Sequence, residues 1–120
     1  MAFVDGVVIA VPTANRAAYI AHAELLAELF IASGASEVVD CWGADVPEGT
    51  VTSFPLAVKT SADETVTFSW ITWPDKETRS SGWEKVLEGE KMIEMPPDLY
   101  DGERMIYGGF DRVQYESKGN

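Results

Sequence analysis

A chain of 120 residues is long enough to bury one hydrophobic core and too short for two, so we expect a single domain over residues 1–120. Its 46% hydrophobic and 24% charged residues exclude a disordered or fibrous protein. Twenty acidic residues against nine scattered basic ones give a formal net charge of −11, which argues against nucleic acid and membrane surfaces as partners.

Residues 3–11 are apolar on both faces of an extended chain, which is typical of a central strand covered on both sides. A helix follows and runs to about Ser33. Thr13 or Asn15 can cap its start, and Gly34 stands where a left-handed residue commonly ends a helix.

Residues 37–44 read as a second strand, followed by a turn over 45–49. Residues 50–59 suggest an extra extended segment, and Pro55 places it at a sheet edge because proline cannot donate to a ladder. Residues 65–73 carry large apolar groups on both faces and predict a second central strand.

A shorter helix is predicted over 74–89, and Gly82 inside it costs roughly 1 kcal/mol relative to alanine. The last strand is predicted over about 104–115, after a tight turn at 101–102. The glycine pair 108–109 marks a bulge or a close backbone approach in that strand.

The order strand, helix, strand therefore occurs twice, which predicts an α+β chain with the ferredoxin-like βαββαβ sandwich. This fold has a four-stranded antiparallel sheet with both helices on one face, and the segment at 50–59 would add to its edge. Since both central strands are apolar on both sides, we expect a second copy to cover the open face, so the sequence predicts a homodimer.

Several short segments together form a specific combination, and singly none is specific. They are 41–46, 51–55, 68–70, 95–96 and 101–110. With these segments, nearly the whole chain resembles a bacterial domain-of-unknown-function family, number 1428, of the dimeric α/β-barrel group of ferredoxin-like folds. The resemblance implies the fold and a dimer but no reaction and no catalytic residue. The wider fold group is similar in outline to cofactor-free monooxygenases, haem-degrading enzymes and ligand carriers.

His22 is the only histidine, and at about 100° per residue it lies on the apolar side of the first helix with Leu26 and Leu29. It is either a core or interface histidine or the base or ligand of a pocket. In the second case Trp70 would floor an apolar pocket that Tyr19 and His22 close, and Arg104 or Tyr107 would supply polar ends. Otherwise the four tryptophans, Trp70 included, pack in the core and dimer interface.

Cofactor and metal chemistry find little support in the sequence. The haem-degrading relatives combine an asparagine, a tryptophan and a histidine, and this chain offers Asn15, Trp70 and His22; however, their histidine lies on the second helix, so we expect no cofactor. One histidine and one cysteine lack the spacing of a metal site. Cys41 has no neighbouring positive charge and is expected to be an inert buried thiol, while Arg104 can pair with Asp101 or Glu103.

The lone Cys41 excludes an intrachain disulfide, and no apolar run approaches the roughly 20 residues of a membrane span, so we expect a cytoplasmic protein. The first functional hypothesis is a homodimer that binds a small apolar or aromatic molecule between helices and sheet. The alternative is a cofactor-free oxygenase-like or isomerase-like enzyme with His22 as base and Arg104 or Trp70 stabilising an anion. A third hypothesis is a dimeric interaction module without a ligand.

Overall fold

The computed structural model describes residues 1–119, and these form one antiparallel sheet with two long helices. The main elements are β1 (Phe3–Pro12), α1 (Arg16–Ala32), β2 (Glu37–Trp42), β3 (Glu64–Trp73), α3 (Lys76–Glu90) and β4 (Ile106–Asp111). The short elements are the 3₁₀ turns η1 (Thr13–Asn15) and η2 (Gly102–Arg104) and the single-turn helix α2 (Phe54–Ala57).

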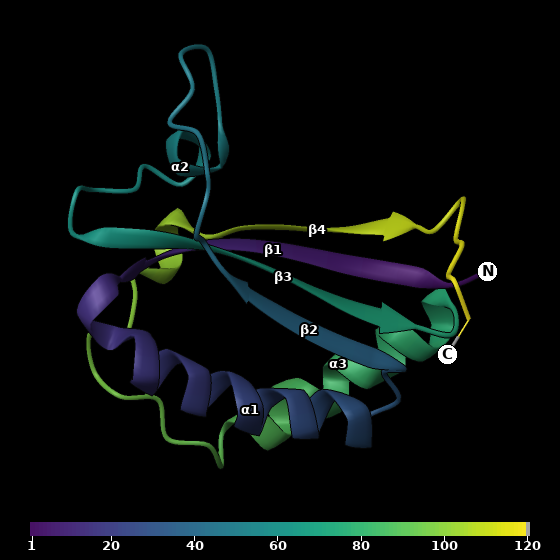
Figure 1. Cartoon of the computed structure of the whole chain (residues 1–120). Helices are drawn as coiled ribbons and strands as arrows, with labels where there is room; N and C mark the ends of the chain where they lie inside the picture. Colours follow the sequence, from purple (N-terminus) through teal and green to yellow (C-terminus); the bar gives the residue numbers. More distant parts are fainter. Residues whose placement is uncertain (120) are drawn as a thin grey trace.

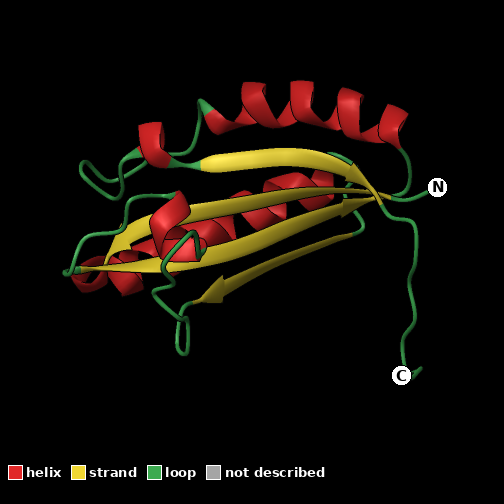
Figure 2. Ribbon diagram, turned by 90° about the horizontal axis from the view of Figure 1, so that it is seen from above, coloured by secondary structure: helices red, strands yellow, loops and turns green. Residues whose placement is uncertain are grey.

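The sheet has the strand order β2-β3-β1-β4, with every neighbouring pair antiparallel. Both long helices lie against one face, while α2 stands on the opposite side (Figures 1 and 2). The ferredoxin-like fold and the central places of β1 and β3 are therefore confirmed. None of the helices that the structure describes has the length and apolar composition needed to cross a membrane.

The start of α1 differs from the prediction, because neither expected side chain caps it. The Asn15 amide instead donates to the carbonyl oxygens of residues 98 and 99, at 3.0 and 3.1 Å. The Thr13 hydroxyl bonds to that of Thr65 at 2.7 Å. The side chains of Thr13 and Asn15 thus form long-range contacts instead of capping the helix. At the other end of α1, Gly34 terminates the helix as expected, with a φ of 117°.

The expected edge segment at 50–59 is wrong, because this part of the chain forms α2 within an excursion over residues 43–63. The Ser53 hydroxyl accepts a hydrogen bond from the Leu56 amide at 3.0 Å, and Pro55 fits the first turn of a helix, where no amide hydrogen is needed. Val58 is fully buried and anchors the excursion on the sheet. Its partners in this cluster are Val8, Ala10, Val46 and Val66.

The last strand is shorter than predicted, because residues 102–104 form η2 and the pairing with β1 ends at Asp111. The predicted bulge is also wrong, since the register runs unbroken through Gly108 and Gly109. Gly109 does mark a close approach, but of side chains. A Cβ there would lie 2.6 Å from the Phe3 ring and 3.1 Å from the guanidinium of Arg79.

A buried carboxylate organises the core beneath α3. Asp5 is 4% exposed and accepts hydrogen bonds from the indole nitrogens of Trp73 and Trp83, each at 2.9 Å. Arg79 adds a bidentate ion pair whose shortest contact is 2.7 Å. Gly82 is present in α3 because a Cβ there would overlap the fully buried Trp73 ring.

Candidate functional site

Four polar side chains are buried between α1 and the sheet, and we call them the buried polar cluster. Tyr19 and His22 lie one turn apart on α1, and Thr67 and Ser69 are alternate residues of β3 that point to the same face. All four are less than a tenth exposed. The prediction that His22 points inward is therefore confirmed.

Two atoms of this cluster have no hydrogen-bond partner among the described residues. They are Nδ1 of His22 and Oγ of Ser69, and both are buried. Thr67, by contrast, donates to the carbonyl of Ile9 at 3.3 Å. A buried polar group left unpaired costs about 1–3 kcal/mol, so such groups usually meet a water molecule or a ligand. Nδ1 of His22 and Oγ of Ser69 are therefore available to form hydrogen bonds with a water molecule or a ligand.

Two other aromatic rings lie close to the ring of Tyr19. The ring of Tyr19 lies 5.9 Å from that of Trp42 and 6.4 Å from that of Tyr100, measured between centroids. Burial raises the pKa of Tyr19, and the nearby hydroxyls of Thr67 and Ser69 only partly oppose this rise. The hydroxyl of Ser69 is close to Tyr19 but does not have the geometry of a hydrogen bond. Tyr19 is therefore a neutral hydrogen-bond donor near pH 7. Apolar walls with a few convergent polar groups are typical of small-molecule sites.

Trp70 does not join this cluster, because neighbouring residues of a strand point to opposite faces. Ser69 faces α1, whereas Trp70 lies on the other side of the sheet, where its indole nitrogen donates to the Glu37 carboxylate at 3.0 Å. The combination of asparagine, tryptophan and histidine is not assembled either. Trp70 is separated from His22 by the sheet, and the Asn15 amide is occupied by backbone carbonyls.

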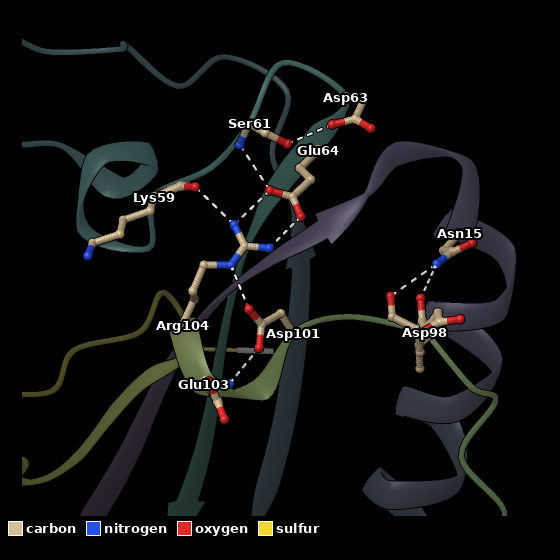
Figure 3. A network of polar contacts seen from close by, with 10 residues as sticks. Asn15, Lys59, Ser61, Asp63, Glu64, Asp98, Asp101, Glu103 and Arg104 are labelled. Carbon is tan, nitrogen blue, oxygen red and sulfur yellow. Dashed lines mark hydrogen bonds and ion pairs between the residues drawn. The ribbon is translucent and has the colours of Figure 1, made fainter.

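Arg104 is held in a polar network at the base of the excursion (Figure 3). Its guanidinium forms a bidentate pair with Glu64 at 2.9 and 2.6 Å, and its Nε donates to Asp101 at 3.0 Å. A further bond of 2.9 Å reaches the carbonyl of Lys59. The expected pairing with Asp101 is confirmed. Arg104 also lowers the pKa of Glu64, the first residue of β3, to about 2.

Tyr107 lies on the edge strand β4 and is 76% exposed. Of the five residues expected at a ligand site, the structure thus brings only Tyr19 and His22 together and leaves Trp70, Arg104 and Tyr107 elsewhere. The sequence analysis missed Thr67 and Ser69. Their signal was present, since hydroxyl residues at 65, 67 and 69 alternate with large apolar residues at 66, 68 and 70 in this central strand.

A second feature is an apolar hollow of about 320 Å³ on the other side of the sheet, beside α2. It is lined by residues 41–46, Phe54 and residues 66–68, so segments that carried the family resemblance meet here. The rings of Phe54 and Phe68 lie edge to face at 5.6 Å. Cys41 is exposed, so the expected burial of its thiol is wrong; β2 is an edge strand that the excursion leaves uncovered.

Over residues 1–119, no group of three or more His, Cys, Asp or Glu side chains is placed to hold a metal ion.

Comparisons with known proteins identify relatives of this chain and solved structures with a similar fold. The family model described as "Protein of unknown function (DUF1428)" matches residues 2–102. The uncharacterized protein YbaA of Escherichia coli K12 is 45% identical over 114 residues, covering 94% of this chain and 97% of the relative, and YbaA of Shigella flexneri matches equally. The structure of a mutant of SnoaB, a cofactor-independent oxygenase from Streptomyces nogalater, covers 95% of both chains with a TM-score of 0.56 and 12% identity. At that identity the likeness is one of fold.

Proposed function

The chain belongs to the DUF1428 family of proteins of unknown function, and from this starting point we propose that it is a cytoplasmic homodimer that binds a small aromatic molecule at the buried polar cluster. The carrying observation is the pair of buried, unpartnered atoms, Nδ1 of His22 and Oγ of Ser69. A ligand hydroxyl or carbonyl that bonds to both would offset their desolvation. The rings around Tyr19 would contact its apolar part.

The homodimer is supported by the open face of the sheet, meaning the face opposite α1 and α3. Outside the excursion, this face carries large exposed apolar side chains, among them Phe68 at 42%, Ile106 at 44% and Phe110 at 63%. Large apolar side chains exposed on one face are typical of interaction sites, and a two-fold pairing of equal faces would cover both copies at once.

Nuclear magnetic resonance of the single histidine tests the ligand site directly. We expect millimolar phenol, 1-naphthol or naphthalene to shift the imidazole signals of His22, with the hydroxylated 1-naphthol binding more tightly than naphthalene. Replacing Ser69 with alanine should weaken 1-naphthol about tenfold, the equivalent of one hydrogen bond of about 1.4 kcal/mol. Ser61, an exposed serine in a loop, provides the control substitution Ser61→Ala. If none of these compounds moved the His22 signals, the ligand site would be refuted.

A second candidate is a cofactor-free oxygenase-like or isomerase-like enzyme that uses the same cluster. It is favoured by Nδ1 of His22, which has no hydrogen-bond partner among the described residues and lies one turn from Tyr19 on α1, because an unpaired imidazole nitrogen can accept a proton. An oxygen electrode with 1-naphthol as the probe would show uptake that His22→Gln abolishes. Binding without turnover would leave the carrier function, and dimerisation without binding would leave an interaction module.

A further inference from the structure

Two features of the open face lie at its opposite corners. One is the hollow, where Phe68 pairs across with Val8 in the second half of β1. The other is Phe110 on β4, which pairs with Val4 near the start of β1. Two strand spacings and four residues separate Phe110 from Phe68, which is about 10 Å across the strands and about 13 Å along them.

Phe110 has the properties of a contact residue. Its ring is 63% exposed and lies over Gly6 and Gly108, where added Cβ atoms would be 3.8 and 3.6 Å from it. The two glycines therefore form a flat floor that holds an aromatic ring on the surface of the sheet. Large apolar side chains are usually buried, but residues 1–119 leave the outer side of this ring largely exposed.

The size of the open face suits a second copy. Four strands spaced about 4.8 Å apart and about eight residues long on average give a footprint of about 19 by 27 Å, or near 500 Å². A standard stable interface buries about 800 Å² on each partner, and the excursion adds side-wall area to the flat footprint. A second copy of this chain is therefore an occupant of the right dimensions.

Three two-fold arrangements can stack two such faces, and two of them conflict with the structure. With the two-fold axis along the strands, both excursions would stand at the same end and collide, since each covers Val8, Ala10 and Val66. With the axis across the strands, the corner at Glu37 would lie over the partner's hollow and bury a carboxylate against apolar groups. Crossed sheets, a common form of face-to-face packing, exchange the corner at Phe110 with the corner at the hollow and keep the exposed Glu37 of each copy at the rim of the interface, outside the hollow.

We propose that the two sheets cross and that Phe110 of each copy packs into the hollow of the other. This inference rests on the homodimer proposed above and adds its geometry and its principal contact. The symmetry produces two identical contacts, each joining an exposed aromatic ring to an apolar hollow lined by Phe54 and Phe68. The hollow is then a socket that only the second copy closes.

Cys41 makes this arrangement testable, because it is the only cysteine and lines the hollow. In the variant Phe110→Cys, a short bis-maleimide should join Cys41 of one copy to the new cysteine of the other and give a covalent dimer on a denaturing gel. Tyr107→Cys is the matched control, since residue 107 lies on the same strand but faces the other side of the sheet. Neither this control nor the wild type should be cross-linked.

Sedimentation velocity on the same samples separates the two levels of the inference. If the wild type sediments as a monomer at micromolar concentration, both the homodimer and the Phe110 contact fail. If Phe110→Cys sediments as a dimer but is not linked, or if Tyr107→Cys is linked equally well, only the Phe110 contact fails. Phe110→Asp should raise the dimer dissociation constant by at least about 30-fold, as for an interface hot spot. Asp111→Asn, on the same strand, should leave the constant unchanged.

Discussion

The interaction of Asp5 with α3 and Trp73 should be the largest single polar contribution to stability, and Asp5→Asn measures it. The asparagine keeps the shape of the side chain, but its amide group must face donors from Trp73, Trp83 and Arg79. At least one donor then loses its acceptor, and the Arg79 charge loses its partner. Breaking one side of a buried pair costs about 3–5 kcal/mol.

This loss is large against a total unfolding free energy of about 5–15 kcal/mol. With a urea slope of about 1.5 kcal/mol/M, the midpoint should fall by about 2–3 M. Tryptophan fluorescence reports the transition, because Trp73 and Trp83 are both partners of the carboxylate. Protein concentration must be equal in all samples, since dimerisation adds to apparent stability.

Two further variants make the measurement discriminating. Arg79→Met leaves the buried Asp5 carboxylate without its counter-charge, although both indole donors remain, so it too should cost about 3–5 kcal/mol. Asp111→Asn, an exposed aspartate on β4, should change the unfolding free energy by no more than about 0.5 kcal/mol. If Asp5→Asn lowered the unfolding free energy by less than about 1 kcal/mol, the Asp5 network would not be the largest polar contribution to stability.

Three other predictions use the same urea assay. The pKa of Glu64 falls from 4.5 to about 2 on folding, so its contribution to the unfolding free energy is complete above pH 4.5 and is lost as the pH falls towards 2. The difference in unfolding free energy between wild type and Glu64→Gln should therefore narrow between pH 4.5 and 2. A constant difference would contradict the ion pair with Arg104. Gly82→Ala should lower stability by about 1–3 kcal/mol through overlap with Trp73, although alanine is the better helix former, and a stabilised variant would refute the packing argument. Ser69→Ala should leave the free protein equally stable or more stable, because it removes an unpartnered hydroxyl, so a loss above about 1 kcal/mol would indicate a partner for that group.

Local patterns in the sequence were sufficient to predict several features of this protein. Apolar residues on both faces identified β1 and β3 as central strands, and Gly34 marked the end of α1. The doubled strand-helix-strand order indicated the fold, and helical periodicity placed His22 on the inward side. Each of these follows from the spacing of residues within one element, which is visible without any tertiary contact.

The packing of the elements, by contrast, determines which groups meet. A strand that is apolar on both faces does not show which face the helices cover, so Ser69 rather than Trp70 joined His22. Glu64 lies 40 residues from Arg104, and Trp83 lies 78 residues from Asp5, so neither pairing has a local signature. From the sequence, Gly82 is a weak point of α3, whereas in the fold the Trp73 ring occupies the place that a Cβ at residue 82 would need. The physical reason is that periodicity specifies a side chain's direction within its own element, whereas its partners depend on how the elements pack.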